Sequence, residues 1–286
     1  MTLPRKVCYL ALSTLVFLSL SFIFISHSAS RAGFLRVTFL NVGQGDAIFI
    51  ETPNGAQFVV DGGPGNTILS ELPHVMPFFD RTIDGIMITN PDTDHYAGFL
   101  ETLSRYNVGI VVESGTISKT STYASLEKMI TEQKIPKTIA KRGQKIVLDA
   151  ESGVYIEILF PDRDVSNLST NDGSIIAKLV YKNTSMMLQG DAPEKIETYL
   201  LSLGDDLNAD ILKTGHHGSK TSSAFEYVKA VSPQYAVISS GGKNRYGHPH
   251  QEVLETLKDL NVSVLRTDTE GRVTFISDGQ SFVRGK

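Results

Sequence analysis

Short apolar, β-branched runs alternate along the chain with longer stretches of helical periodicity. The short runs predict strands at residues 35–40, 47–51, 58–60, 83–88, 108–112, 146–148, 155–160, 175–181, 185–188, 209–213, 235–239, 264–266 and 272–276. Helical patterns cover residues 67–79, 95–106, 121–133, 192–203, 222–230 and 251–260. Strand-rich segments interrupted by helices, in two successive rounds, predict two sheets packed face to face with helices outside them.

Residues 7–25 form a separate apolar run that follows Arg5 and Lys6. The run is longer than the core of an ordinary signal peptide and just reaches membrane-spanning length. We therefore expect residues 1–30 to be a cleaved signal peptide or an N-terminal membrane anchor, and residues 34–286 to form one exported domain. The basic residues ahead of the run favour a domain that is secreted or anchored to the cytoplasmic membrane facing outward, with residues 7–25 in the membrane if uncleaved.

Composition narrows the chemistry of the predicted domain. The chain is 41% apolar and 20% charged, which is typical of a folded protein. Its only cysteine, Cys8, lies in the apolar run, so residues 34–286 have no thiolate and no disulfide. Residues 1–30 hold two of the 27 basic residues and none of the 31 acidic ones, so the remainder carries a net charge of −6. This balance argues against a broad basic nucleic-acid surface.

Five polar clusters each follow a predicted strand, and loops at strand ends are where α/β folds place ligands. The clusters are residues 41–46, 61–63, 90–95, 190–191 and 214–219. The third cluster places Asn90, Asp92, Asp94 and His95 within six positions, and carboxylate and imidazole donors packed so closely indicate a metal site. Asp94 has an alternative role as the N-cap of the following helix.

The remaining clusters supply further candidate ligands. Asp191 fits either a metal site or a turn before Pro193. The pair His216-His217, flanked by glycines, is a stronger metal signal because paired histidines in a Gly-rich loop rarely belong to a core. His248 precedes a predicted helix and fits either the site or an exposed position.

Taken together, these motifs resemble the metallo-β-lactamase-like domain of the ComEC competence proteins and its stand-alone relatives. The match runs from about Leu35 to Arg284 and rests on an ordered series of motifs: 41–47, 61–63, Asp92-x-Asp94-His95, 171–174, 190–191, 212–219 and 246–249. The resemblance implies an α/β (α+β) fold, namely a four-layer αββα sandwich with a metal site at one edge of the two sheets.

The resemblance also assigns roles to residues. As metal ligands it implies Asp92, Asp94, His95, Asp191 and one histidine of the pair, for which we choose His216 over His217. For a hydrolase with this metal site we further expect Asp46, Asp61 and Asn171 to support the ligands, Asp191, His217 and His248 to have catalytic roles, and Lys213, Ser219, Lys220 and Tyr246 to contact the substrate. The cofactor implied is a divalent metal, Zn²⁺ first and Mn²⁺ as the alternative.

The chain departs from the family pattern at one metal position. Two-metal members use both histidines of the hexad and a third from a later loop, whereas this chain has Asn90 and Asp92 there and no histidine from Tyr96 to Gly215. The sequence is therefore compatible with one ion or with two. In the second case, Asp92, Asp191 and water would hold the additional ion.

The function expected from this pattern is metal-dependent hydrolysis of a phosphodiester, with DNA or RNA outside the cytoplasmic membrane as the substrate. Two alternatives stay open: hydrolysis of a cell-envelope phosphodiester such as teichoic-acid phosphorylcholine, and binding of metal or nucleic acid without hydrolysis. No feature of the sequence resembles a lactam pocket, and none identifies a protein partner.

Overall fold

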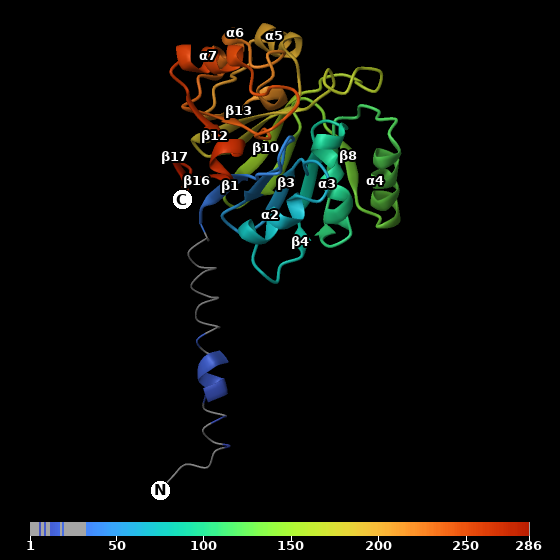
Figure 1. Cartoon of the computed structure of the whole chain (residues 1–286), viewed down its shortest axis with the longest axis vertical. Coiled ribbons are helices and arrows are strands. Elements are labelled where there is room, and N and C mark those ends of the chain that lie inside the picture. The colour runs from blue at the N-terminus through green and yellow to red at the C-terminus, as the bar shows by residue number, and fades with distance from the viewer. Residues whose placement is uncertain (1–5, 7–8, 10–11, 18, 20–32, 286) are drawn as a thin grey trace.

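The computed structural model describes residues 6, 9, 12–17, 19 and 33–285, and Figure 1 shows how their helices and strands are arranged. The signal or anchor predicted for residues 1–30, with its apolar run 7–25, lies largely outside these residues. Within the described part of the chain, no helix is both long enough and apolar enough to cross a membrane.

The first sheet has eight strands in the order β17-β16-β1-β2-β3-β5-β7-β8. They are β1 (Leu35–Phe39), β2 (Ile48–Glu51), β3 (Gln57–Val60), β5 (Gly85–Ile88), β7 (Val111–Glu113), β8 (Lys137–Ile139), β16 (Val273–Ser277) and β17 (Phe282–Arg284). The pairs from β17 to β3 are antiparallel, and those from β3 to β8 are parallel.

The second sheet has seven strands in the order β15-β14-β13-β12-β11-β10-β9. They are β9 (Lys145–Asp149), β10 (Val154–Phe160), β11 (Ile176–Tyr181), β12 (Thr184–Gln189), β13 (Ile211–Lys213), β14 (Tyr235–Ile238) and β15 (Ser263–Arg266). Strands β12 to β15 run parallel, so the chain leaves several of them at the same edge. A separate two-stranded sheet pairs β4 (Thr82–Ile83) with β6 (Asn107–Val108).

Helices cover the outer face of each sheet (Figure 1). The first sheet is covered by α2 (Ile68–Val75), α3 (Thr93–Leu103) and α4 (Ser121–Glu132), and the second by α5 (Glu194–Ser202), α6 (Phe225–Val231) and α7 (Gln251–Asp259). Two short helices, η1 (Gly215–Gly218) and α8 (Thr267–Glu270), lie in loops.

Three hydrophobic clusters fill the spaces between the four layers. Successive side chains of a strand point to opposite faces of its sheet, so they belong to different clusters. On β2, Ile48 and Ile50 join the cluster between the sheets, whereas Phe49 joins the cluster under α2 and α3. On β12, Met186 faces the other sheet and Met187 faces the helices. These alternating positions are buried on both faces, which explains why the strands read as nearly continuous apolar runs. The expected αββα sandwich is confirmed.

Several element boundaries differ from the sequence-based prediction. The expected helix at residues 67–79 ends at Val75, because Pro77 favours an extended conformation at Met76, whose φ and ψ are −100° and 154°. The expected strand 83–88 is divided between β4 and β5, and 108–112 between β6 and β7. Strands β8 and β17 were not predicted; both are short and have exposed positions, which gives them a weak apolar pattern.

Candidate metal centre

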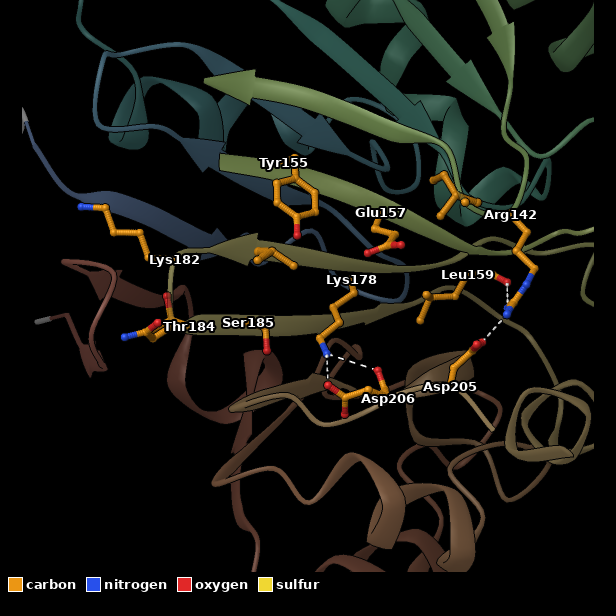
Figure 2. Close-up of a pocket in the computed structure, with 14 residues that line it drawn as sticks. Arg142, Tyr155, Glu157, Leu159, Lys178, Lys182, Thr184, Ser185, Asp205 and Asp206 are labelled. Carbon is orange, nitrogen blue, oxygen red and sulfur yellow. Dashed lines mark hydrogen bonds and ion pairs between the residues drawn. The ribbon is translucent and has the colours of Figure 1, made fainter. Parts of the chain in front are cut away.

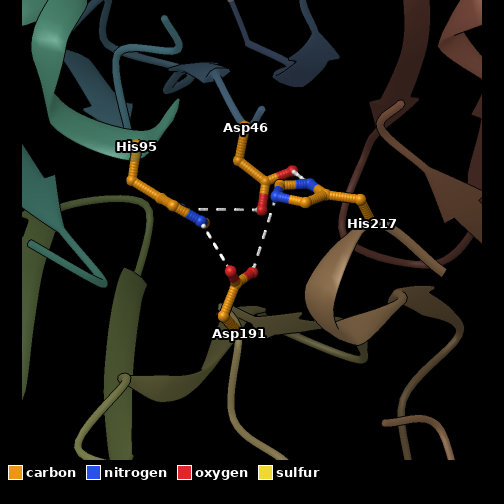
Figure 3. A group of neighbouring side chains, drawn as sticks. All are labelled: Asp46, His95, Asp191 and His217. Carbon is orange, nitrogen blue, oxygen red and sulfur yellow. Dashed lines mark ion pairs between the residues drawn. The ribbon is translucent and has the colours of Figure 1, made fainter. Parts of the chain in front are cut away.

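Four buried polar side chains meet where loops from the two sheets converge (Figure 3). Asp46 follows β1, His95 lies in the first turn of α3, Asp191 follows β12 and His217 lies in η1. One donor atom of each lies within 4.8 Å of the others. Nε2 of His95 lies 3.1 Å from Oδ2 of Asp191, and Nε2 of His217 lies 3.7 Å from Oδ1 of Asp191. This spacing suits two imidazoles and a carboxylate around one ion.

Close backbone packing brings the loops together. The amide of Asp46 donates to the carbonyl of Asp94, and at Gly45 a Cβ would meet that same carbonyl oxygen at 2.3 Å, so only glycine fits. His216 and His217 both have left-handed backbone conformations, with φ of 47° and 55°. Such conformations are uncommon for non-glycine residues and are often found at functional sites.

The other ring nitrogen of each histidine is held by oxygen acceptors. Nδ1 of His95 lies 2.9 Å from Oδ2 of Asp61, which also accepts from the hydroxyl of Thr89 at 2.6 Å. Nδ1 of His217 lies 3.1 Å from the carbonyl of Ser239 and 3.3 Å from Oδ1 of Asp46. A proton on each Nδ1 leaves Nε2 with a free lone pair, which is the arrangement usual behind metal-bound histidines.

The residues present fit a divalent metal. Nε2 of His95, Nε2 of His217, Oδ1 of Asp191 and Oδ1 of Asp46 are buried and have no hydrogen-bond partner. Buried polar atoms are normally satisfied, so four unsatisfied ones in one cluster point to a missing ligand. Two imidazoles with carboxylates form a donor set that Zn²⁺ accepts readily and Mn²⁺ tolerates.

Asp94 suits the fourth ligand position better than Asp46. Oδ2 of Asp94 lies 3.4 Å from Nε2 of His217, on the metal-facing side of that ring. Asp46 faces the opposite nitrogen, and its Oδ2 lies 2.8 Å from the ammonium of Lys213. Asp46 thus directs Oδ2 toward Lys213 and Oδ1 toward the Nδ1 side of His217, which suits the supporting position expected for it.

Opposite charges raise the pKa values of the buried imidazoles despite their burial. Burial lowers the pKa of His217, but Asp46 and Asp191 outweigh it and raise the pKa to about 10. In the same way, Asp191 and Asp61 raise the pKa of His95 well above its usual value against the effect of burial. Burial also opposes ionisation of Asp191, yet the two imidazoles hold its pKa well below the usual range. Without metal, protons on these rings therefore balance the carboxylates.

The geometry corrects the choice between the paired histidines. His217 reaches the cluster with a side chain that is 1% exposed, whereas His216 is partly exposed and its Nδ1 contacts the hydroxyl of Thr221 at 3.1 Å. Nε2 of His216 lies 3.7 Å from Oδ2 of Asp191, at the margin of the cluster. The geometry favours His217 as the ligand because the successive left-handed residues turn its ring inward.

Lys213 also differs from its expected role. Its side chain is 1% exposed, and its ammonium contacts Asp46 and donates to the carbonyl of Thr214 at 2.7 Å. An ammonium enclosed in this way has no access to a substrate, so the predicted substrate contact is not compatible with the structure. Its position on β13 directs it between the loops rather than toward solvent.

A cavity of about 490 Å³ lies over the cluster. Its lining includes Asp92, Asp94, Asp191, His216, His217, His248, Gln44, Arg245 and Tyr246. The predicted contacts Ser219 and Lys220 do not line it: Ser219 is buried against Thr221, and Lys220 is exposed near Glu252. Tyr246 is half exposed and lies nearly parallel to the ring of His248, with ring centroids 5.6 Å apart. Burial and the nearby His216 and His217 lower the pKa of His248 to about 4.

Several supporting residues of the site lie in or beside the motifs but were not singled out from the sequence. Thr89 donates through both its amide and its hydroxyl to Asp61, and the hydroxyl of Ser174 accepts from the amide of Asp191 at 2.8 Å. Gln44 contacts Nδ1 of His248 at 3.3 Å. Each lies beside a residue of the motifs, but side-chain type alone does not distinguish such supports from ordinary loop residues.

A second cavity, of about 430 Å³, lies on the outer face of β10, β11 and β12 (Figure 2). Four of its charged side chains form two pairs: Arg142 contacts Asp205 at 2.5 Å, and Lys178 contacts Asp206 at 3.8 Å. No histidine lines it. The motifs of the sequence therefore converge on the first cavity and not on this one.

The chain is similar to a known family and to several known proteins. Residues 40–242 match the family model described as the metallo-beta-lactamase superfamily. The chain is 28% identical over 258 residues to ComE operon protein 3 of Bacillus subtilis (strain 168), covering 84% of this chain and 33% of that protein. It is 30% identical over 252 residues to Recombination protein 2 of Haemophilus influenzae, and the match covers 85% of this chain and 29% of that protein. It is 29% identical over 244 residues to Competence protein ComA of Neisseria gonorrhoeae, and the match covers 84% of this chain and 32% of that protein.

The chain thus spans about a third of the length of these relatives. Among solved structures, Igni18, a metallo hydrolase from Ignicoccus hospitalis KIN4/I, superposes with a TM-score of 0.55 at 15% identity, covering 85% of this chain and 98% of that one. This likeness concerns the fold alone.

Proposed function

The chain belongs to the metallo-beta-lactamase superfamily, and on this premise we propose that it is a metal-dependent phosphodiesterase that acts on nucleic acid outside the cytoplasmic membrane. One observation carries the proposal: two buried imidazole Nε2 atoms without hydrogen-bond partners face Asp191 beneath a cavity. Asp94, whose side chain is 32% exposed, links this cluster to the cavity.

A divalent ion held by Asp94, His95, Asp191 and His217 would lower the pKa of water and polarise a phosphoryl oxygen. Asp191 remains ionised, since its pKa lies well below the usual range, and it would orient the attacking water. His248 is neutral at pH 7 because its pKa is about 4. The neutral ring is no general acid at pH 7, and a pKa of about 4 also makes it a weak base, so we assign His248 to a hydrogen bond with the attacking water.

Arg245 is the only arginine or lysine among the residues that line the cavity. Its guanidinium lies 5.0 Å from the centre of the Tyr246 ring and donates to the Tyr246 hydroxyl at 2.9 Å. This contact holds a positive charge at the cavity rim, opposite the carboxylates. We assign Arg245 to a non-bridging phosphoryl oxygen of the substrate and Tyr246 to its orientation.

One argument favours nucleic acid among phosphodiesters, and the charge of the cavity limits the form of that substrate. The names of the relatives, Competence protein ComA and Recombination protein 2, refer to processes that act on DNA. A single cation at the cavity also suits contact with one phosphate at a time, and the net charge of −6 on residues 31–286 does not suit a long basic track. A single strand or a strand end is the form of substrate that best matches this cavity.

The test is hydrolysis by the full chain loaded with Zn²⁺ or Mn²⁺. We expect cleavage of single-stranded DNA, RNA or bis-p-nitrophenyl phosphate that stops on chelation and in Asp191→Asn. Asp149→Asn is a matched control, because Asp149 is also buried and accepts backbone hydrogen bonds but lies in β9. Absence of cleavage over a range of pH with both metals contradicts the proposal and supports a binding domain without turnover.

A cell-envelope phosphodiester is the second candidate, and the acidic balance of the chain favours it. Competition between DNA and teichoic acid for the same loaded protein separates the two. Preferential hydrolysis of the envelope polymer supports the second candidate.

We further propose that residues 7–25 deliver the domain across the cytoplasmic membrane, by either a cleaved signal or an anchor. N-terminal sequencing of the protein from a membrane fraction and from the medium distinguishes these outcomes. Full-length chain retained in the cytoplasm contradicts export.

A further inference from the structure

Asn90 has no free donor atom to offer a metal. Its side chain is fully buried, its Nδ2 donates to Oδ1 of Asn171 at 2.7 Å, and its Oδ1 accepts the amide of Asp92 at 3.0 Å. Moving the amide toward an ion would break both hydrogen bonds, and a neutral amide oxygen is a poor replacement for an imidazole.

Asp92 is also engaged by the loop before β11. Its Oδ2 accepts the hydroxyl of Thr170 at 2.9 Å. Binding a second ion here would need several oxygen or nitrogen ligands. No further histidine, aspartate or glutamate accompanies Asp92 along this side of the cavity, apart from Asp94 and Asp191 of the first set.

These contacts cross from one sheet to the other. Asn90 and Asp92 follow β5 of the first sheet, and Thr170 and Asn171 precede β11 of the second. The amide of Ile175 donates to the carbonyl of Thr89 at 2.9 Å, which continues the link. The hydroxyl of Ser174 donates to the same carbonyl at 3.3 Å and accepts from the amide of Asp191.

We infer that Asn90, Asp92, Thr170 and Asn171 form a hydrogen-bonded clamp where a second ion would otherwise lie, and that the site holds one divalent ion. The clamp fixes the loop of residues 169–174 beside Asp191 without a metal. This inference rests on the proposed metal site but not on the proposed phosphodiesterase activity, because neither of its tests measures turnover.

The first test is the metal content of the full chain after loading with Mn²⁺ and removal of free metal. We expect one ion per chain, unchanged in Asp92→Asn and lost in His217→Ala. A second ion that disappears in Asp92→Asn overturns the inference. A second ion that persists in Asp92→Asn lies elsewhere, for example on exposed histidines, and leaves the clamp position unfilled as inferred.

The second test is hydrogen–deuterium exchange of residues 169–175 in the metal-free chain. We expect Asn171→Ala to speed exchange there about fivefold, as loss of one buried hydrogen bond does, and Asn90→Ala to do the same. The double variant should exchange no faster than Asn90→Ala, because Asn90→Ala already removes the bond to Asn171 together with the bond from the Asp92 amide. Asn183→Ala, which removes an exposed side-chain bond to Gln280, is the control and should leave this segment unchanged. Unaltered exchange in both single variants contradicts the clamp.

Discussion

The ammonium of Lys213 lies 2.8 Å from Oδ2 of Asp46, and both side chains are almost completely buried. Oδ1 of the same carboxylate lies 3.3 Å from Nδ1 of His217, so a buried cation, a carboxylate and an imidazole follow one another toward the metal position. The cation compensates Asp46, which allows the carboxylate to stay ionised in a buried environment; against the effect of burial, its pKa is held well below the usual range by Lys213 and His217.

Removal of this cation should destabilise the fold. Lys213→Met leaves His217 as the main remaining partner of the buried Asp46 charge, which we expect to reduce the free energy of unfolding by about 3 kcal/mol. Urea unfolding of the metal-free chain measures the change. Lys128→Met, at an exposed pair with Glu132, is the control and should alter stability by no more than about 0.5 kcal/mol. Equal stability of the two variants would show that His217 alone compensates the Asp46 charge.

Metal affinity should increase with pH. His217 has a pKa of about 10 in the metal-free protein, so metal must displace its proton at neutral pH. Calorimetric titration with Zn²⁺ in two buffers of different ionisation enthalpy should reveal proton release. Uptake of protons on binding would exclude His217 as a ligand.

The stability of the metal-free chain should show the opposite trend. The pKa of His217 is higher in the folded state than in the unfolded state. The protonated ring therefore stabilises the fold fully at pH values below the unfolded-state pKa near 6.5. This stabilisation is lost as pH rises from there through about 10. Urea unfolding at stepped pH should therefore show a decline over this window that is reduced in His217→Asn; an equal decline in that variant would assign the effect to other groups.

Asp61 should control metal affinity without touching the metal. It accepts hydrogen bonds from the Thr89 amide, the Thr89 hydroxyl and Nδ1 of His95, and an amide at this position cannot accept all three. We expect Asp61→Asn to weaken metal binding about 10–100-fold, measured by competition with a chelator. Asp149→Asn again serves as the control, with unchanged affinity. A similar loss in both variants would indicate general destabilisation instead.

Arg245 should affect substrate binding more than metal binding. Removal of its guanidinium in Arg245→Ala should raise KM for bis-p-nitrophenyl phosphate about 5–20-fold, as expected for loss of a charged hydrogen bond, with metal content unchanged. Tyr246→Phe removes the hydroxyl that holds Arg245 and should give a smaller increase in KM. Lys243→Ala is the control, because Lys243 does not line the cavity. An unchanged KM in Arg245→Ala would place the phosphate elsewhere.

The four-layer architecture could be predicted because alternation along the strands and periodicity in the helices are local properties of the sequence. The loops that carry the site could also be identified, since each polar cluster follows an apolar run. The choice between His216 and His217 depends instead on two successive left-handed residues, which no side-chain pattern specifies. Lys213 looked like an accessible cation because its partner, Asp46, lies 167 positions away and is brought near only by folding.

The proposed metal donors come evenly from the two sheets. Asp94 and His95 follow β5 of the first sheet, whereas Asp191 and His217 follow β12 and β13 of the second. Each half of the sandwich therefore contributes one carboxylate and one imidazole, and neither half alone offers more than a weak two-donor chelate. Tight binding of an ion would consequently require that the two sheets are packed together as in the native fold. Partly folded chains should therefore lose metal that the native protein retains.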